Sequence, residues 1–173
     1  MQRVVLIGEP MLELAQQGDL WRLAHGGDTL NTAIHLARMG IDTAYFTAIG
    51  SDPLSAGLRA SWAAEGLDCS LVLTHPARST GLYAITTDPA GERSFTYWRD
   101  SSAARAMFAL EGMPAALQTA EQADLLAFSL ISLAILPDDG RGALLALAAR
   151  VRARGGRVAF DGNYRPRLCA DAA

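Results

Sequence analysis

Lysine is absent from the chain: all 15 basic residues among its 173 residues are arginines. Without a lysine side chain, the chain supplies no Schiff-base nucleophile, no pyridoxal anchor and no lysine for a Walker A loop. The basic residues are outnumbered by 18 acidic ones, which gives a formal net charge of −3, and no arginine-dense segment is interleaved with aromatics. The composition therefore gives little support to a nucleic-acid function.

Cysteine is scarce, and long apolar runs are missing. Cys69 and Cys169 lie far apart and outside any CxxC or Cys/His spacing, so the sequence predicts neither a zinc site nor a redox motif. The first apolar run stops at Gly8, which makes it too short for a signal peptide or a membrane span. We therefore expect a soluble, cytoplasmic protein.

Short apolar runs alternate with helical patterns along the chain. Such alternation with short connections is typical of an α/β fold, in which a parallel sheet carries helices on its faces. No linker or repeat divides residues 1–173, so we predict one domain. A sheet that ends with its last predicted strand has an open edge, which indicates a fragment or a chain completed by a partner. Strands are predicted at 3–7, 43–49, 124–129 and 157–161, and helices at 28–40, 53–66, 111–121 and 138–154.

Two hairpin patterns interrupt this alternation. The first spans residues 11–24, around the turn at Gln17-Gly18-Asp19, and is more polar than the opening strand. The second joins residues 81–87 to residues 93–99 through a five-residue loop, 88–92, that contains proline and glycine. The first hairpin could cover part of the molecule rather than belong to its core.

A glycine pair precedes the first predicted helix. Gly26 and Gly27 allow the backbone to approach a ligand closely, and the free N–H groups of a helix start favour a polar or anionic molecule. A plain turn, with Asp28 or Thr29 capping the helix, explains the pair at least as well. Asn31 favours a ligand, because asparagine is a mediocre helix former whose amide can hold a hydroxyl group.

Five separated segments form a further pattern: GEPMLEL at the start, GGDTLNTA from Gly26 with LARMG after it, Gly81-Leu82-Tyr83, Tyr97-Trp98-Arg99 and the terminal DGNYR from Asp161. In this order they resemble motifs of the ribokinase-like (PfkB) carbohydrate kinases, and in particular the branch that acts on 2-keto-3-deoxygluconate. One position departs from the family signature, because Thr29 stands where Gly, Ala or Pro is usual.

The resemblance implies a ribokinase-like fold, with a mostly parallel sheet flanked by helices and a small β lid that closes over the sugar. The lid is expected to be discontinuous, at about 10–25 and 79–100, and to help form a homodimer. The match covers the whole chain but only the first half, or somewhat more, of a typical family member. We therefore expect an N-terminal portion whose fold is incomplete at the C-terminus.

The resemblance also assigns roles to individual residues. Gly27 would line the sugar site through its backbone, Asn31 would hold hydroxyl groups, and Tyr83 and Tyr97 would come from the lid. Two arginines would address the carboxylate of an acidic sugar, which suits their planar, permanently charged side chains. These arginines are Arg99 and Arg165, and the supporting residues are Gly26, Asp28, Asp161 and Asn163.

Simpler explanations exist for the same residues. Tyr83 and Tyr97 could be a cross-strand packing pair, and Arg99 could form a surface ion pair with its neighbour Asp100. Asp161 and Asn163 could serve only to orient the arginine that follows them.

The family's second signature, a DTxGAGD-like segment with the catalytic aspartate, has no counterpart in the 173 residues, and neither does its NxxE magnesium motif. The resemblance implies ATP and Mg²⁺ in the intact enzyme, whereas no catalytic residue or metal ligand is expected in this chain. Phosphoryl transfer depends on those groups, so we expect the isolated chain to be inactive. Two alternatives stay open: another ribokinase-like kinase, for fructose or ribose, and a non-catalytic module that binds a sugar acid.

Overall fold

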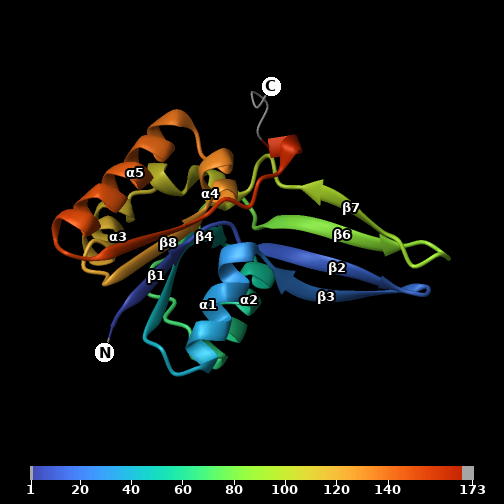
Figure 1. Cartoon of the computed structure of the whole chain (residues 1–173). Helices are drawn as coiled ribbons and strands as arrows, with labels where there is room; N and C mark the ends of the chain where they lie inside the picture. The colour runs from blue at the N-terminus through green and yellow to red at the C-terminus, as the bar shows by residue number, and fades with distance from the viewer. Residues whose placement is uncertain (1, 169–173) are drawn as a thin grey trace.

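The structure, a computed structural model, describes residues 2–168 and contains two sheets (Figure 1). The larger sheet has five strands, and all of its pairings are parallel. The apolar, β-branched run of β1 lies at its centre, buried on both faces, as expected for a central parallel strand. The strand order is β5 (Val72–His75), β4 (Thr43–Gly50), β1 (Val4–Ile7), β8 (Leu125–Ser129) and β9 (Arg157–Asp161).

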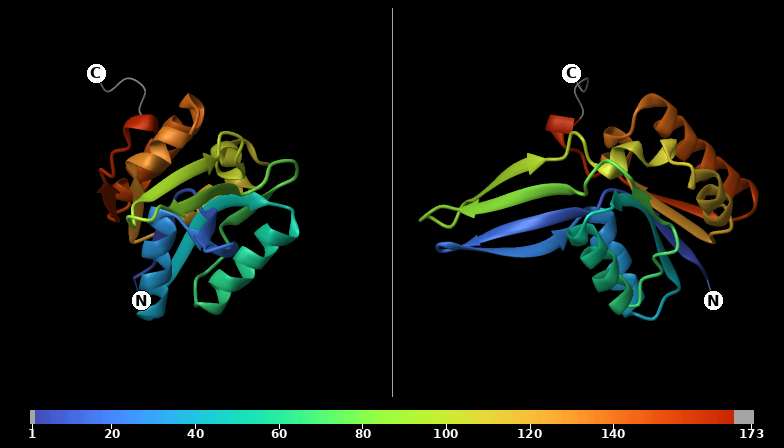
Figure 2. Two further views of the ribbon diagram at one scale, coloured as in Figure 1. Left: turned by 90° about the vertical axis from the view of Figure 1, so that its right-hand side faces the viewer. Right: turned by 180° about the vertical axis from the view of Figure 1, so that it is seen from behind.

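Helices cover both faces of this sheet (Figures 1 and 2). Val4 and Leu6 of β1 pack in the cluster that contains α1 (Asp28–Arg38) and α2 (Pro53–Ala64). Val5 and Ile7 point to the opposite face, as strand alternation requires. That face carries the short helix η1 (Ala103–Ala109) with α3 (Met113–Ala120) and α5 (Asp138–Ala153).

The smaller sheet has four strands and projects from one end of the body (Figure 2). It consists of two antiparallel hairpins joined through a parallel pairing of β2 with β6. Both hairpins occur where the turn residues predict them. The order is β3 (Leu20–Gly26), β2 (Met11–Gln17), β6 (Gly81–Thr87) and β7 (Arg93–Trp98).

The α/β class and the parallel sheet confirm the prediction from sequence, but four short elements were missed. These are β5, η1, α4 (Leu130–Ile135) and η2 (Pro166–Leu168). Helix α4 follows β8 directly, and a reciprocal pair of hydrogen bonds between Ser129 and Ser132 caps its start. Because β8 and α4 form one continuous apolar run, periodicity alone does not separate strand from helix.

Strand β9 forms one edge of the five-stranded sheet, and Phe160 on it is half-exposed. This position matches the open edge expected from the sequence. Within residues 2–168, no helix is both long and apolar enough to cross a membrane. Cys69 is a half-buried free thiol, whereas Cys169 lies outside the described residues.

Candidate sugar-binding site

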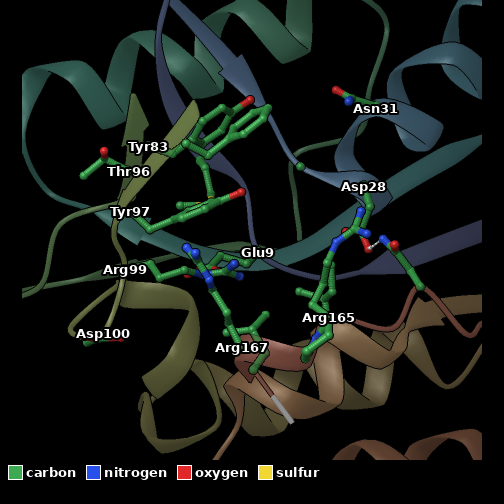
Figure 3. A pocket seen from close by; sticks show the side chains of 17 residues that line it. Glu9, Asp28, Asn31, Tyr83, Thr96, Tyr97, Arg99, Asp100, Arg165 and Arg167 are labelled. Carbon is green, nitrogen blue, oxygen red and sulfur yellow. Dashed lines mark hydrogen bonds and ion pairs between the residues drawn. The ribbon is translucent and has the colours of Figure 1, made fainter. Parts of the chain in front are cut away.

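A cavity of about 900 Å³ lies between the four-stranded sheet, the start of α1 and the segment that follows β9 (Figure 3). Its size is within the range of small-molecule sites. All six residues that the sequence singles out as substrate-binding line this one cavity, although they come from four separate segments. These residues are Gly27, Asn31, Tyr83, Tyr97, Arg99 and Arg165.

The glycine pair is required by close packing at the cavity wall. Gly27 has a φ of +137°, and a Cβ atom there would lie 2.7 Å from the carbonyl oxygen of Glu9. A Cβ atom at Gly26 would overlap the hydroxyl group of Tyr83. Neither Asp28 nor Thr29 caps α1, contrary to prediction: Gly27 is the N-cap residue, and no side chain caps the helix. The N-cap residue itself therefore offers no side-chain acceptor to the first N–H groups of α1.

Thr29 and Asp28 support the first turn of α1 from two sides. Thr29 is buried, and its hydroxyl lies 3.1 Å from the hydroxyl of Tyr45, in space left open by Gly8. Burial raises the pKa of Tyr45, which keeps this phenol neutral. Asp28 accepts the N–H of Thr29 at 2.7 Å and the side-chain amide of Asn163 at 3.0 Å. This hydrogen bond from Asn163 connects the segment that follows β9 to the start of α1.

The sheet side of the cavity carries an aromatic cluster. Tyr83 on β6 and Tyr97 on β7 are directly paired across the strands, with ring centres 5.9 Å apart. Phe95 stacks on Tyr97 at 6.3 Å. The hydroxyl of Tyr83 donates a hydrogen bond to the carboxylate of Glu13. Burial, together with this hydrogen bond, raises the pKa of Tyr83. The two tyrosines therefore both pack across strands and line the cavity.

Arg99 is paired with a buried carboxylate that sequence reasoning missed. Its Nη2 group donates to Glu9, and the hydroxyl of Ser102 donates to the other oxygen of the same carboxylate. The expected alternative, a pair with Asp100, is wrong: no ion pair joins Arg99 to Asp100 in the described chain. Arg99 also lies beside Tyr97, with its guanidinium carbon 5.8 Å from the ring centre.

Arg165 differs from Arg99 in its charged neighbours. Neither Arg165 nor Arg167 forms an ion pair with any acidic side chain of residues 2–168, and both are exposed at the cavity. The expected role of Asp161 and Asn163 in orienting Arg165 is not seen among the described contacts. Asp161 instead accepts the backbone N–H of Asn163 at 3.0 Å. In Figure 3, Tyr97 and Arg99 enter the cavity from the sheet side, whereas Arg165 and Arg167 both come from the segment that follows β9.

Glu9, Phe95 and Arg167 line the cavity, and Glu13 supports it through Tyr83, although the sequence reasoning selected none of them. Strand alternation gives part of the sequence signal for Glu13. In the register of β2 with β6, Glu13 pairs with Tyr83, so both side chains lie on one face of the sheet. Nothing in the sequence indicates that Glu9 reaches Arg99, which is 90 residues away. The cavity combines planar aromatic rings, the N-terminal end of α1 and exposed guanidinium groups, which suit a hydroxylated ligand with a negative charge.

The family profile described as "pfkB family carbohydrate kinase" matches residues 1–173. The chain belongs to this family. A 2-dehydro-3-deoxygluconokinase from Dickeya dadantii (strain 3937) is 42% identical over 171 residues, which cover 96% of this chain and 55% of that relative. A fructokinase from Vibrio alginolyticus is 29% identical over 172 residues, with 99% of this chain and 54% of the relative covered.

Among solved structures, the PfkB protein from Polaromonas sp. JS666 has a TM-score of 0.83 and 29% sequence identity, and the match covers 97% of this chain and 58% of that one. This likeness confirms the ribokinase-like fold expected from the motifs. The chain spans about half the length of the curated PfkB relatives it matches.

Proposed function

We propose that this chain forms the sugar-acid site of a PfkB kinase that acts on 2-keto-3-deoxygluconate, also written 2-dehydro-3-deoxygluconate. The whole enzyme would transfer the γ-phosphoryl group of ATP to the terminal hydroxyl of the sugar acid. The observation that carries this proposal is the cavity in which Arg165, without an acidic partner in the described chain, faces a glycine-lined helix start. The 42% identity to the Dickeya relative supports the same substrate class.

In this proposal, the described residues bind and orient the substrate. Tyr97 and Asn31 would contact the sugar from opposite walls, and the N–H groups at Gly27 would approach it through the backbone. Arg165 would bind the carboxylate, because its charge is not offset by an ion pair in the described chain. Arg99 is already paired with Glu9, so the two arginines would contribute unequally to recognition of the acid.

ATP and Mg²⁺ belong to this proposal only for the whole enzyme. Within residues 2–168, no group of three or more His, Cys, Asp or Glu side chains is arranged to hold a metal ion. We expect the 173 residues alone to bind the sugar acid without turning it over. The four-stranded sheet would act as the lid over the bound sugar.

The lid proposal extends to a homodimer. Trp21, Leu23 and Trp98 are about half-exposed, and the strand register puts them on the face of the four-stranded sheet opposite Tyr83 and Tyr97. Exposed apolar clusters of this kind favour association. A second copy of the chain is the occupant that we propose for this face. The whole protein would work in the cytoplasm.

Titration calorimetry on the chain tests the substrate assignment. We expect 2-keto-3-deoxygluconate to bind more tightly than fructose or ribose. Preference for a neutral sugar would contradict the acid assignment and favour another PfkB sugar kinase. A chimera of residues 1–168 with the remaining part of the Dickeya relative then tests catalysis in a coupled assay. Turnover by the chimera and none by the chain alone would support the proposal, whereas binding without turnover by either would favour a non-catalytic sugar-acid module.

A further inference from the structure

Glu9 is a charged residue buried at the base of the cavity. Its side chain is 1% exposed, and both carboxylate oxygens are engaged within the protein, one by Arg99 and the other by Ser102. A ligand in the cavity would therefore meet Arg99 rather than the carboxylate behind it. This leaves Glu9 without a direct role in binding, although burying its charge is costly.

Glu9 lies where the four-stranded sheet joins the body. It follows β1 and precedes β2, and Arg99 follows the last strand of that sheet. Ser102 lies just before η1, and a Cβ atom at Gly81, the first residue of β6, would be 3.2 Å from the Glu9 carboxylate. The carboxylate thus lies beside the start of β6 and is bonded to the residue after β7 and to the residue before η1.

The pairing also determines which donors of Arg99 remain. Its Nη2 group is bonded to Glu9, whereas its Nε–H is buried and has no partner among the described residues. This Nε–H is buried away from the cavity solvent, so any N–H group that Arg99 offers to a ligand belongs to its Nη atoms. Because a guanidinium group is planar, holding one edge fixes the direction of the remaining N–H groups.

We propose that Glu9 is a positioning residue, which holds Arg99 in one orientation so that its remaining N–H groups are presented to the bound sugar. The identity of that sugar rests on the function proposed above, whereas the orientation of Arg99 does not. If Glu9 acts through Arg99, its contribution to binding must vanish when Arg99 is removed.

A double-mutant cycle measured by titration calorimetry tests this dependence. We expect Glu9→Gln to weaken binding of 2-keto-3-deoxygluconate about tenfold or more, as for loss of one well-oriented charged hydrogen bond. In an Arg99→Met background, Glu9→Gln should change affinity less than about twofold, by the additivity of unconnected sites. Glu9→Asp should recover part of the loss. Glu65→Gln, which breaks the remote surface pair with Arg38, is the matched control and should leave binding unchanged.

Equal losses from Glu9→Gln in both backgrounds, or no loss in either, would overturn the proposal. A measurement without ligand distinguishes a wrong role for Glu9 from a wrong substrate assignment. In NMR spectra of the unliganded chain, the guanidinium signals of Arg99 are those that disappear in Arg99→Met. These signals should report slow rotation of the group in the original chain, faster rotation in Glu9→Asp and full averaging in Glu9→Gln.

Fast rotation in the original chain would refute a positioning role even if Glu9→Gln fails to fold. If the chain binds fructose instead of the acid, the substrate assignment fails, and the same cycle measured with fructose still tests Glu9. If it binds neither sugar, the proposed function fails and the NMR result decides the role of Glu9.

Discussion

Replacing Arg165 by methionine should weaken binding of the sugar acid by about 10- to 30-fold and leave fructose binding nearly unchanged. A hydrogen bond to a charged group contributes about 1.5–3 kcal/mol. Arg165 is exposed and has no ion-pair partner in residues 2–168, so the lower part of this range, about 1.5–2 kcal/mol, applies. Each ~1.4 kcal/mol is a tenfold change in Kd, which gives the expected loss.

The stability of the same variant should stay within about 0.5 kcal/mol of the original, because Arg165→Met leaves no described acidic side chain without a partner. Arg99→Met provides the contrast. Its side chain is 11% exposed, and its guanidinium is paired with the buried carboxylate of Glu9. Removing one partner of a buried pair leaves an uncompensated charge, which should cost about 3 kcal/mol of unfolding free energy.

The two variants are compared by urea unfolding and by titration calorimetry with 2-keto-3-deoxygluconate and fructose. Arg165→Met should affect acid binding alone, and Arg99→Met should affect stability as well. Two results would refute the reasoning: an equal loss of affinity for both sugars in Arg165→Met, or a loss of stability in Arg165→Met as large as that in Arg99→Met.

Three further predictions concern other parts of the chain. Gly27→Ala should destabilise the chain by about 1–3 kcal/mol in thermal unfolding and weaken sugar binding, because φ is +137° and the carbonyl of Glu9 is close; unchanged stability would contradict this. Asp52 is the N-cap residue of α2, and its carboxylate accepts the backbone N–H of Ser55. Burial alone would raise the pKa of Asp52, but the hydrogen bonds from Ser55 lower this pKa overall. Asp52→Ala should therefore cost about 1 kcal/mol at pH 7, with the difference shrinking as the pH falls below about 4 because the native carboxyl loses its charge; a difference independent of pH would be inconsistent with this role. Leu23→Glu should shift the chain toward monomer in sedimentation experiments if the exposed sheet face is a dimer contact, and an unchanged mass would exclude that face.

The long helices and every strand except β5 were predictable because each one is encoded locally. The apolar run at Val4–Ile7 is typical of a strand buried on both faces, and Pro53 marks the first turn of α2. The hairpin at Gln17-Gly18-Asp19 follows from turn chemistry, and Gly18 indeed has a positive φ. Helix α4 was not predictable in this way, because its apolar residues continue directly from a strand.

The six candidate site residues were identified through motifs, and they do share one cavity, although sugar binding by them stays a prediction. The pairing of those residues was not predictable. Asp100 is next to Arg99 in sequence, yet the guanidinium pairs with Glu9 instead. Asn163, expected to support Arg165, bonds to Asp28 on α1. These contacts join segments far apart in the chain.

The amino-acid sequence by itself determined the alternation of strands and helices, the two hairpins and the family. These depend on hydrophobic periodicity, turn residues and short motifs, which act over a few neighbouring positions. Only the tertiary structure decided which arginine is paired within the protein and which is open to a ligand. That distinction depends on whether a carboxylate is buried beside the guanidinium, and burial is a property of the packed chain.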